Sequence, residues 1–472
     1  MTDPTQTSDM AFWRLAIYGL PALPAAFLYV PLTTLLPAFY AQELGVSLAA
    51  VGGFMFVSRI FDIVIDPVLG RWSDQTKSPW GRRKPFMVLA TPILMLGAWL
   101  VFMPPEGATG MHLLLATAVI YFGASMKGLA YSAWGAEIVE HYHGRSKVAG
   151  VREVANVLGI VIAASIPAIT GIYGYNGVDR FTMGVMGGVM MVITPLTVLL
   201  AIKFVPERPA PVQMPMSWWA AMTSLMRNKP FRLLCIVFFI INFGASITNT
   251  TLVFYISHYL GQPEVIGPVL LASFTFVMLG VPLWVFISRH IGKHKAAGIS
   301  LFLAISLNGL LAMQIGPGQG WLFVALMCLL GITSSAFLTL PLGIVGDIID
   351  YDTLKTRQSR GGLFFGIWAL FQYMSPALAI GITLPALEYL GFSATGGNTP
   401  EALQALKYVF ILAPLPFFLG GALMFFLFPI DARRHAIIRR RIDARRRREA
   451  TLEHTLAPGQ VLPQATPSAE GT

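Results

Sequence analysis

The stretch RIFDIVIDPVLGRWSDQTKSPWGRRKPF, residues 59–86, holds two aspartates inside an apolar run and a cluster of basic residues directly after it. Asp62 and Asp66 are four residues apart, so on a helix they share one face. Ionisable residues inside a membrane-spanning helix are rare and are functional candidates by default. Two carboxylates in a partly dry site cannot both stay ionised without help. The stretch therefore predicts a membrane helix whose carboxylate pair needs a proton, a bound cation or a basic side chain.

A simpler interpretation of this helix stays open. Arg59 lies three residues before Asp62, so the two side chains can form a local ion pair. Asp66 would then cap structure near the end of the helix. Under this interpretation the pair stabilises the helix and binds no cation.

The rest of the chain has the composition of a membrane protein. Its 472 residues are 55% hydrophobic and only 12% charged, and its mean hydropathy is +0.66. A soluble protein carries about 25% charged residues, and a membrane-spanning helix needs about 20 mostly apolar ones. Runs of this kind predict an all-α membrane protein with twelve transmembrane helices, near residues 13–40, 48–70, 86–104, 111–136, 150–174, 182–205, 231–258, 265–288, 296–315, 320–346, 361–390 and 405–429.

The runs divide into two groups of six. We expect residues 1–205 and 231–430 to form two six-helix bundles, joined by a cytoplasmic linker over 206–230. The linker contains an amphipathic piece, Ser217–Met226, which we expect to lie on the membrane surface. Residues 431–472 form a basic tail whose last part has a disordered composition.

Positive charge is concentrated on one side of the predicted membrane. Basic loops follow the second, fourth, eighth and tenth runs, and the loops on the other side are nearly free of Lys and Arg. By the positive-inside rule these basic loops and both termini are cytoplasmic. The net charge of +10 owes much to nine arginines between residues 433 and 448, which favours contact with anionic lipid over binding of nucleic acid. We expect an integral multi-pass protein of a bacterial inner membrane.

Residues 59–86 resemble the signature of the glycoside–pentoside–hexuronide:cation symporters, in which Asp-x-x-x-Asp-Pro-x-x-Gly precedes a basic Trp-Gly turn. DIIDYDTLKTRQSRGGLFFGIWALFQ, residues 347–372, looks like a second family segment, and AYSAWGAEIV, residues 130–139, like a weaker third. The resemblance covers about residues 10–430 and implies the major-facilitator fold and alternating access. Animal lysophospholipid transporters are similar too, which leaves a lipid substrate open.

The resemblance assigns roles to individual residues. It places Asp62 and Asp66 on the family's two cation-site aspartates, with H⁺ or Na⁺ as the coupling ion and no other cofactor. Arg59 matches the arginine just before that pair. Trp134 falls on an aromatic beside the sugar, and Arg152 on an arginine that faces the cavity.

Three departures put a disaccharide substrate in doubt. The family's sugar-binding aspartates line up with Ala26 and Ala130, and a lysine frequent on the eleventh helix lines up with Tyr373. Lys127 stands about where the family has a threonine near the cation. Its ammonium would act as a built-in cation for the aspartates, which favours proton coupling or uniport, or it would anchor an anionic substrate.

Further residues are candidates for the cavity and for gates. Asn156, four residues after Arg152, and Gln372 beside Tyr373 are expected to contact substrate. Asp74, Arg82, Arg83 and Lys84 are expected to pair with acidic groups of the other bundle and close the cytoplasmic side. At the end of the tenth helix, Asp347, Asp350 and Asp352 are expected to pair with Lys355, Arg357 and Arg360, or with basic loops across the cleft.

These features predict a secondary active transporter. We expect a monomer that moves a small solute, a glycoside, uronide or related sugar, by H⁺ or Na⁺ symport. The chain has no Walker loop, no Gly-x-Ser-x-Gly and no metal-ligand spacing of histidines, so we expect no enzyme. A lysolipid or amphiphile carrier of the same fold, and a membrane receptor that transports nothing, remain alternatives.

Overall fold

The structure is a computed structural model that describes residues 10–76, 78–138, 142–207, 218–356 and 360–455, and every regular element in them is helical. The first half of the chain contains α1 (Phe12–Gly19), α2 (Ala22–Phe27), the π-helical turn η1 (Pro31–Leu35), α3 (Leu36–Gln42), α4 (Leu48–Gln75), α5 (Lys84–Phe102), α6 (Gly110–Ile138), α7 (Tyr142–Ile172) and α8 (Arg180–Phe204). The second half contains α9 (Trp218–Met226), α10 (Lys229–Phe254), the π-helical turn η2 (Tyr255–Leu260), the 3₁₀ turn η3 (Pro263–Val265), α11 (Ile266–Ile291), α12 (Lys293–Gln314), α13 (Gly320–Thr356), α14 (Gly361–Tyr389), α15 (Pro400–Ile411), α16 (Leu415–Phe426) and α17 (Ala432–Thr455).

Within these described ranges, twelve segments are long and apolar enough to cross a membrane, which confirms the predicted count. The first segment, Phe12–Gln42, is broken into short pieces that hold several prolines. Proline lacks the backbone N–H that a continuous helix needs, so several prolines close together in this segment favour breaks in the helix. The tenth segment ends at Thr356, ten residues beyond the apolar run, because its polar last turns continue as helix.

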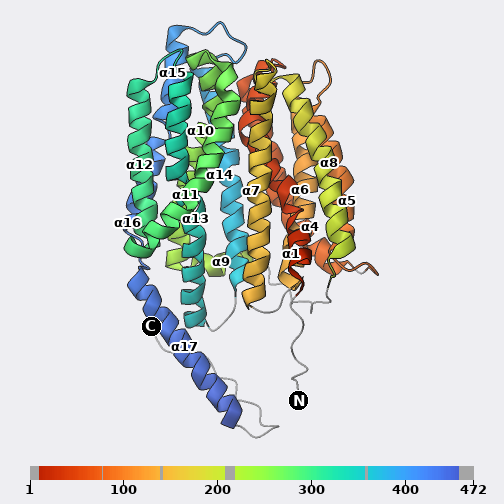
Figure 1. Cartoon of the computed structure of the whole chain (residues 1–472), viewed down its shortest axis with the longest axis vertical. Helices are drawn as coiled ribbons and strands as arrows, with labels where there is room; N and C mark the ends of the chain where they lie inside the picture. The colour runs from red at the N-terminus through yellow and green to blue at the C-terminus, as the bar shows by residue number, and fades with distance from the viewer. Residues whose placement is uncertain (1–9, 77, 139–141, 208–217, 357–359, 456–472) are drawn as a thin grey trace.

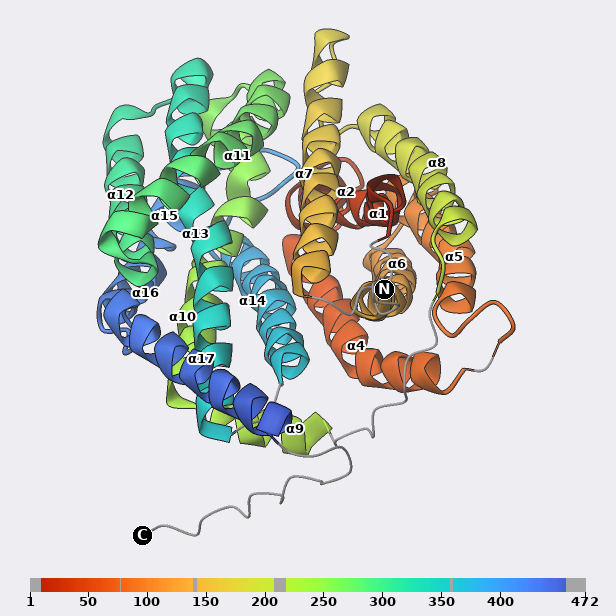
Figure 2. The same cartoon turned by 60° about the horizontal axis from the view of Figure 1, so that its bottom comes forward.

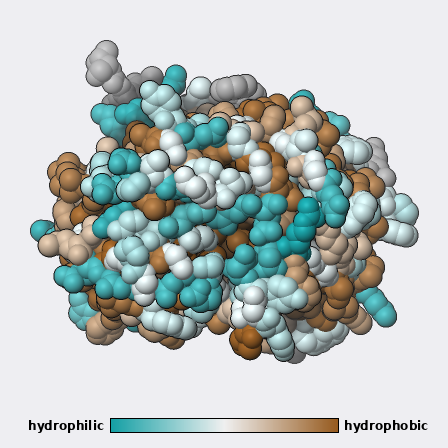
Figure 3. All heavy atoms as spheres, turned by 90° about the horizontal axis from the view of Figure 1, so that it is seen from above, coloured by the Kyte–Doolittle hydropathy of each residue, from teal (hydrophilic) through white to brown (hydrophobic). Residues whose placement is uncertain are grey.

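The helices form two groups that lie side by side. Elements α1–α8 are on one side of the molecule and α10–α17 on the other (Figures 1 and 2). Helix α17 and the beginning of α1 lie toward the same end of the molecule, which is called the terminal side below, and the opposite end is called the far side. Seen from the far side, polar residues gather across the centre and apolar residues lie around the rim (Figure 3).

Glycines allow the closest helix packing inside each group. A Cβ atom added at Gly159 in α7 would clash with the carbonyl oxygen of Leu23 in α2. A Cβ atom at Gly97 in α5 would lie 2.6 Å from the Cα of Ile120 in α6. Small residues at such crossings let membrane helices approach, since a lipid environment supplies little hydrophobic driving force.

The two groups touch each other on the far side. The backbone N–H of Ala49, at the start of α4, donates to Glu388 Oε2 at the end of α14 over 2.6 Å, and Gln42 Nε2 lies 3.2 Å from His258 Nε2. Tight glycine crossings join the same ends of the bundles: Gly52 against Ile380, Gly381 against Phe56, and Gly267 against Ala168. The bundles are therefore closed against each other on the far side.

Candidate functional site

The carboxylate of Asp62 is fully engaged within the first bundle. Its side chain is 4% exposed in the middle of α4. Arg59 Nη1 lies 2.9 Å from its Oδ2, and the Ser125 hydroxyl of α6 donates to its Oδ1 over 2.6 Å. The local ion pair that the spacing allowed is therefore present.

Asp66, one turn along the same helix, is less well satisfied. Its Oδ1 is buried and has no hydrogen-bond partner among the described residues. The carboxylate lies within electrostatic range of both Asp62 and Arg59. One guanidinium thus serves two carboxylates, and the site lacks one positive charge. A proton or a monovalent cation at Asp66 would supply it.

Arg59 also joins the two bundles. Its guanidinium carbon lies 4.5 Å from the ring centre of Tyr121 in α6 and 4.6 Å from that of Tyr373 in α14. Tyr373 is 43% exposed although protein surrounds it, and Tyr29 has the same exposure in similar surroundings. The ring of Tyr373 therefore stays accessible beside the Arg59 guanidinium, where the two bundles meet.

Lys127 does not contact the carboxylates in this conformation. Its side chain is 2% exposed, and its Nζ donates to the carbonyl oxygen of Pro21 over 2.9 Å. The reason is helix geometry, because residues two apart point about 200° away from each other. Ser125 faces Asp62, so Lys127 faces the opposite side of α6, toward the first segment. Arg59, not Lys127, provides the built-in cation here.

Trp134 lies in the interior of the first bundle and not on a cavity wall. Its side chain is 0% exposed, its Nε1 donates to the Pro206 carbonyl oxygen over 3.3 Å, and its ring packs at 5.7 Å against Tyr18. A side chain with no accessible surface cannot touch a solute in this conformation. The expectation that Trp134 contacts substrate is therefore corrected for this state.

The other predicted cavity residues are more accessible. Arg152 is half-buried, with its guanidinium carbon 5.0 Å from the ring centre of Tyr131. Asn156 Nδ2 donates to Glu153 on the same helix over 3.3 Å. Gln372 is exposed on α14 next to Tyr373. Tyr373 contacts Arg59 and is linked through it to the carboxylate pair, whereas no such contact is described for Arg152, Asn156 or Gln372.

The predicted basic gate pairs within its own bundle. Arg82 Nη2 and Arg83 Nη2 lie 3.3 Å and 2.8 Å from Glu137 Oε1 in α6. Lys84 Nζ donates to the Ile202 carbonyl oxygen in α8 over 3.0 Å. The carboxylate of Glu207 accepts the backbone N–H groups of residues 82–84 at the start of α5, where the helix dipole favours an anion. The side chain of Asp74 lies outside the described part of the structure.

The predicted acidic gate also pairs within its own half. Lys293 Nζ lies 2.7 Å from Asp347 Oδ1, and His435 of α17 lies 3.1 Å from Asp350 Oδ2. Arg439, one turn further along α17, lies 3.5 Å from Asp350 Oδ1. In this conformation the contacts expected across the cleft are replaced, among the described residues, by contacts inside one bundle.

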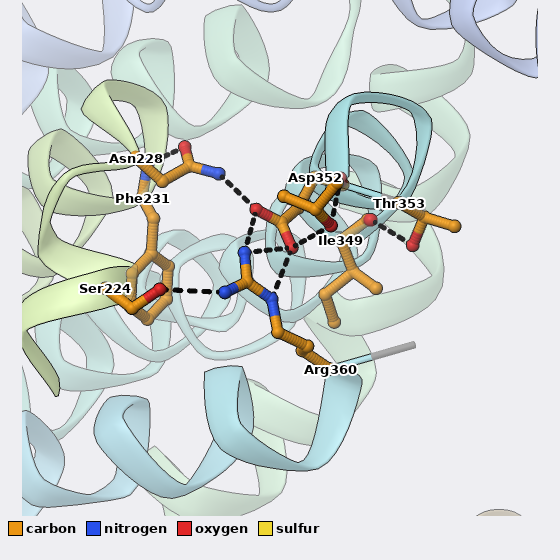
Figure 4. Close-up of polar contacts among 8 residues, drawn as sticks. Ser224, Asn228, Phe231, Ile349, Asp352, Thr353 and Arg360 are labelled. Carbon is orange, nitrogen blue, oxygen red and sulfur yellow. Dashed lines mark hydrogen bonds and ion pairs between the residues drawn. The ribbon is translucent and has the colours of Figure 1, made fainter. Parts of the chain in front are cut away.

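Asp352 forms the predicted pair with Arg360. The guanidinium lies 2.8 Å from Asp352 Oδ1, and its other side donates to Ser224 of α9 over 2.8 Å (Figure 4). Asn228 Nδ2 donates to the same carboxylate over 3.4 Å. Arg357 lies outside the described residues. This network attaches the surface helix α9 to the end of α13.

Sequence reasoning missed several partners in these sites. Tyr121 and Ser125 lie in the middle of α6, whereas Glu137 lies at its end, Glu207 follows the end of α8, and His435 lies near the start of α17. Ser125 and Tyr121 are four residues apart and so share one helix face, which the sequence alone could have indicated. The partners at element ends depend on how separate helices pack, and a single sequence carries no direct signal for that.

A family model described as MFS/sugar transport protein matches residues 17–432. The chain belongs to this family. The match confirms the resemblance to glycoside/cation symporters and makes the chain a multi-pass membrane transporter of the major facilitator class rather than an enzyme.

Several proteins are similar to most of this chain. The human sodium-dependent lysophosphatidylcholine symporter 1 is 24% identical over 434 residues, covering 83% of this chain and 78% of its own. The glucuronide carrier protein homolog of Escherichia coli (strain K12) is 20% identical, covering 92% of this chain and 96% of its own. A crystal structure of the nucleoside transporter NupG has a TM-score of 0.62 at 15% identity and covers 87% of this chain and 98% of its own. This structural likeness confirms the major-facilitator fold.

Proposed function

We propose that this transporter is a symporter that moves its solute together with one monovalent cation, H⁺ or Na⁺, bound at Asp66. The unpartnered buried oxygen of Asp66 carries the proposal, because Arg59 already neutralises Asp62. A cation at Asp66 completes the charge balance, and its release restores the imbalance. The transporter should therefore change the side to which it opens more easily when the cation is bound, or after the side chains around Asp66 have rearranged.

We place the terminal side in the cytoplasm. The basic loops, α9 and the arginine-rich α17 lie on that side, as the positive-inside rule requires. Contact on the far side and self-contained ion pairs on the terminal side then correspond to an inward-facing state. Rocking of the bundles about the level of Arg59 would open the far side, which is the alternating access of this fold.

The solute is a small polar molecule, and a glycoside or uronide is our first candidate. Arg152 and Asn156 offer donors for the carboxylate of a uronide, and the E. coli relative is named a glucuronide carrier homolog. A lysolipid is the second candidate. Alanines 26 and 130 and Tyr373 replace polar sugar ligands of the family pattern, and the human relative is named a lysophosphatidylcholine symporter.

Uptake into liposomes tests the proposal. Purified protein is reconstituted and given labelled glycosides, uronides and lysophosphatidylcholine under separate sodium and proton gradients. We expect one solute class to accumulate under one gradient only, and Asp66→Asn to reduce this accumulation to background. Glu106→Gln, an exposed carboxylate in the loop after α5, is the matched control and should leave uptake unchanged. Accumulation by Asp66→Asn at the wild-type level would refute the role of Asp66.

A further inference from the structure

The guanidinium of Arg59 is held on three sides by groups from three helices. Asp62 of α4 pairs with it at 2.9 Å, and the rings of Tyr121 and Tyr373 lie at 4.5 Å and 4.6 Å. Tyr121 belongs to the first bundle and Tyr373 to the second. An arginine against two aromatic faces is stabilised electrostatically, and its flat shape suits stacking in a way that a lysine ammonium does not.

The position of Arg59 determines how many cations the site needs. A guanidinium has five N–H donors and can bridge two carboxylates. Asp66 lies within electrostatic range of Arg59, one turn from Asp62. If Arg59 moved between the two aspartates, it would compensate both of them in part, and an external cation would gain less by binding. Arg59 must stay on Asp62 for Asp66 to need a cation.

We propose that Tyr121 and Tyr373 are positioning residues that keep Arg59 on Asp62 and so reserve Asp66 for the transported cation. The proposal rests on the proposed function and extends it to the residues that set the cation affinity. The two rings that hold Arg59, those of Tyr121 and Tyr373, are called the clamp below. Because Tyr373 comes from the second bundle, movement of the bundles shifts one of these two rings. Cation binding and bundle position are thereby linked through one side chain.

Cation binding to the purified protein tests this without knowledge of the solute. The midpoint of thermal stabilisation is measured in detergent as Na⁺ is titrated at constant ionic strength, and as pH is varied without Na⁺. Tyr373→Phe keeps the ring, so the Na⁺ concentration at the midpoint should stay within about twofold of wild type. Tyr373→Leu removes the ring, so this concentration should rise about tenfold, as loss of about 1.4 kcal/mol would cause. Tyr121→Leu should act in the same direction.

Arg59→Gln separates positioning from a merely structural role. Without the guanidinium, both carboxylates need compensation, so the cation dependence should become steeper and reach two cations per chain. A single-site dependence in Arg59→Gln, or equal midpoints for Tyr373→Leu and Tyr373→Phe, would overturn the clamp. A wild-type protein that responds to neither Na⁺ nor pH would refute the proposed function itself, and the clamp with it.

Discussion

The carboxylates inside the membrane and those on the terminal side are compensated differently. On the terminal side, Asp352 has Arg360, and Asp347 and Asp350 share Lys293, His435 and Arg439. Inside the membrane, two aspartates share one arginine and one serine. A fully paired carboxylate stabilises the fold. A carboxylate that lacks a compensating charge inside the membrane destabilises the fold, so its presence indicates a function.

The largest expected effect comes from replacing each of the two membrane aspartates in turn. Asp62→Ala leaves Arg59 without its partner, so we expect gradient-driven uptake to fall at least about 100-fold, which corresponds to about 2.7 kcal/mol, together with a lower unfolding temperature. Asp66→Ala should abolish uptake equally but leave the unfolding temperature unchanged or raised, because it removes an uncompensated carboxylate. Uptake assays and thermal unfolding of both variants measure this. A loss of stability in Asp66→Ala as large as in Asp62→Ala would mean that both aspartates are structural.

A paired carboxylate of the terminal side should show the opposite pattern. Asp352→Ala leaves the guanidinium of Arg360 partly buried without its anion, and we expect the free energy of unfolding to fall by about 3 kcal/mol. Transport per folded molecule should stay within about twofold of wild type, since the contacts described for Asp352 involve Arg360 and Asn228 and no residue of the proposed site. Unfolding by SDS and uptake normalised to folded protein are the measurements, with Asn228→Ala as a milder control. Complete loss of transport in correctly folded Asp352→Ala would assign this pair to the transport cycle.

A more exposed pair should matter less. Lys293 is 39% exposed, and its partner Asp347 keeps His435 after the lysine is removed. Lys293→Gln should therefore lower the free energy of unfolding by only about 0.5 kcal/mol, and less at high salt. SDS unfolding at low and high salt gives the value. A salt-independent loss of several kcal/mol would show that the pair is shielded from water.

The smallest effect concerns the start of α17. Asp431 accepts the backbone N–H of Arg434 over 2.7 Å, and this hydrogen bond holds the pKa of the Asp431 carboxyl below its ordinary value. The hydrogen bond favours the ionised carboxylate, so it stabilises the helix above the ordinary aspartate range, about pH 4. This contribution is lost as the pH falls further. Amide hydrogen exchange of α17 should rise slightly in acid for wild type. Asp431→Ala should show the faster exchange already at neutral pH, and Asp431→Asn should show little pH dependence.

The prediction from sequence succeeded where a local pattern carries the information. Apolar runs of about 20 residues gave the twelve spans, and the Asp62–Asp66 spacing gave the intramembrane pair. The resemblance of residues 59–86 and 347–372 gave the family. Each of these features is a property of neighbouring residues, so packing does not change it.

The prediction was weaker where two distant segments had to meet. One of the two roles predicted for Lys127 would place it beside the aspartates, but the turn of α6 brings Ser125 there instead. Trp134 was expected in the cavity, but the bundle encloses it. The basic residues 82–84 found partners in Glu137 and Glu207, which no spacing indicated. Such partners are chosen by the rotation of each helix and by the conformational state of the two bundles.

The sequence alone thus determined that the chain spans a membrane twelve times, which side carries the positive charge, and that two carboxylates lie in the apolar phase. The cost of moving apolar residues into water or charges into lipid decides these features, and it acts on each residue separately. Only the tertiary structure decided that Ser125 reaches Asp62 from α6, that one carboxylate oxygen of Asp66 is left without a hydrogen-bond partner among the described residues, and that Tyr373 reaches Arg59 from the other bundle. These contacts join α4, α6 and α14, and they exist only where three helices pack together.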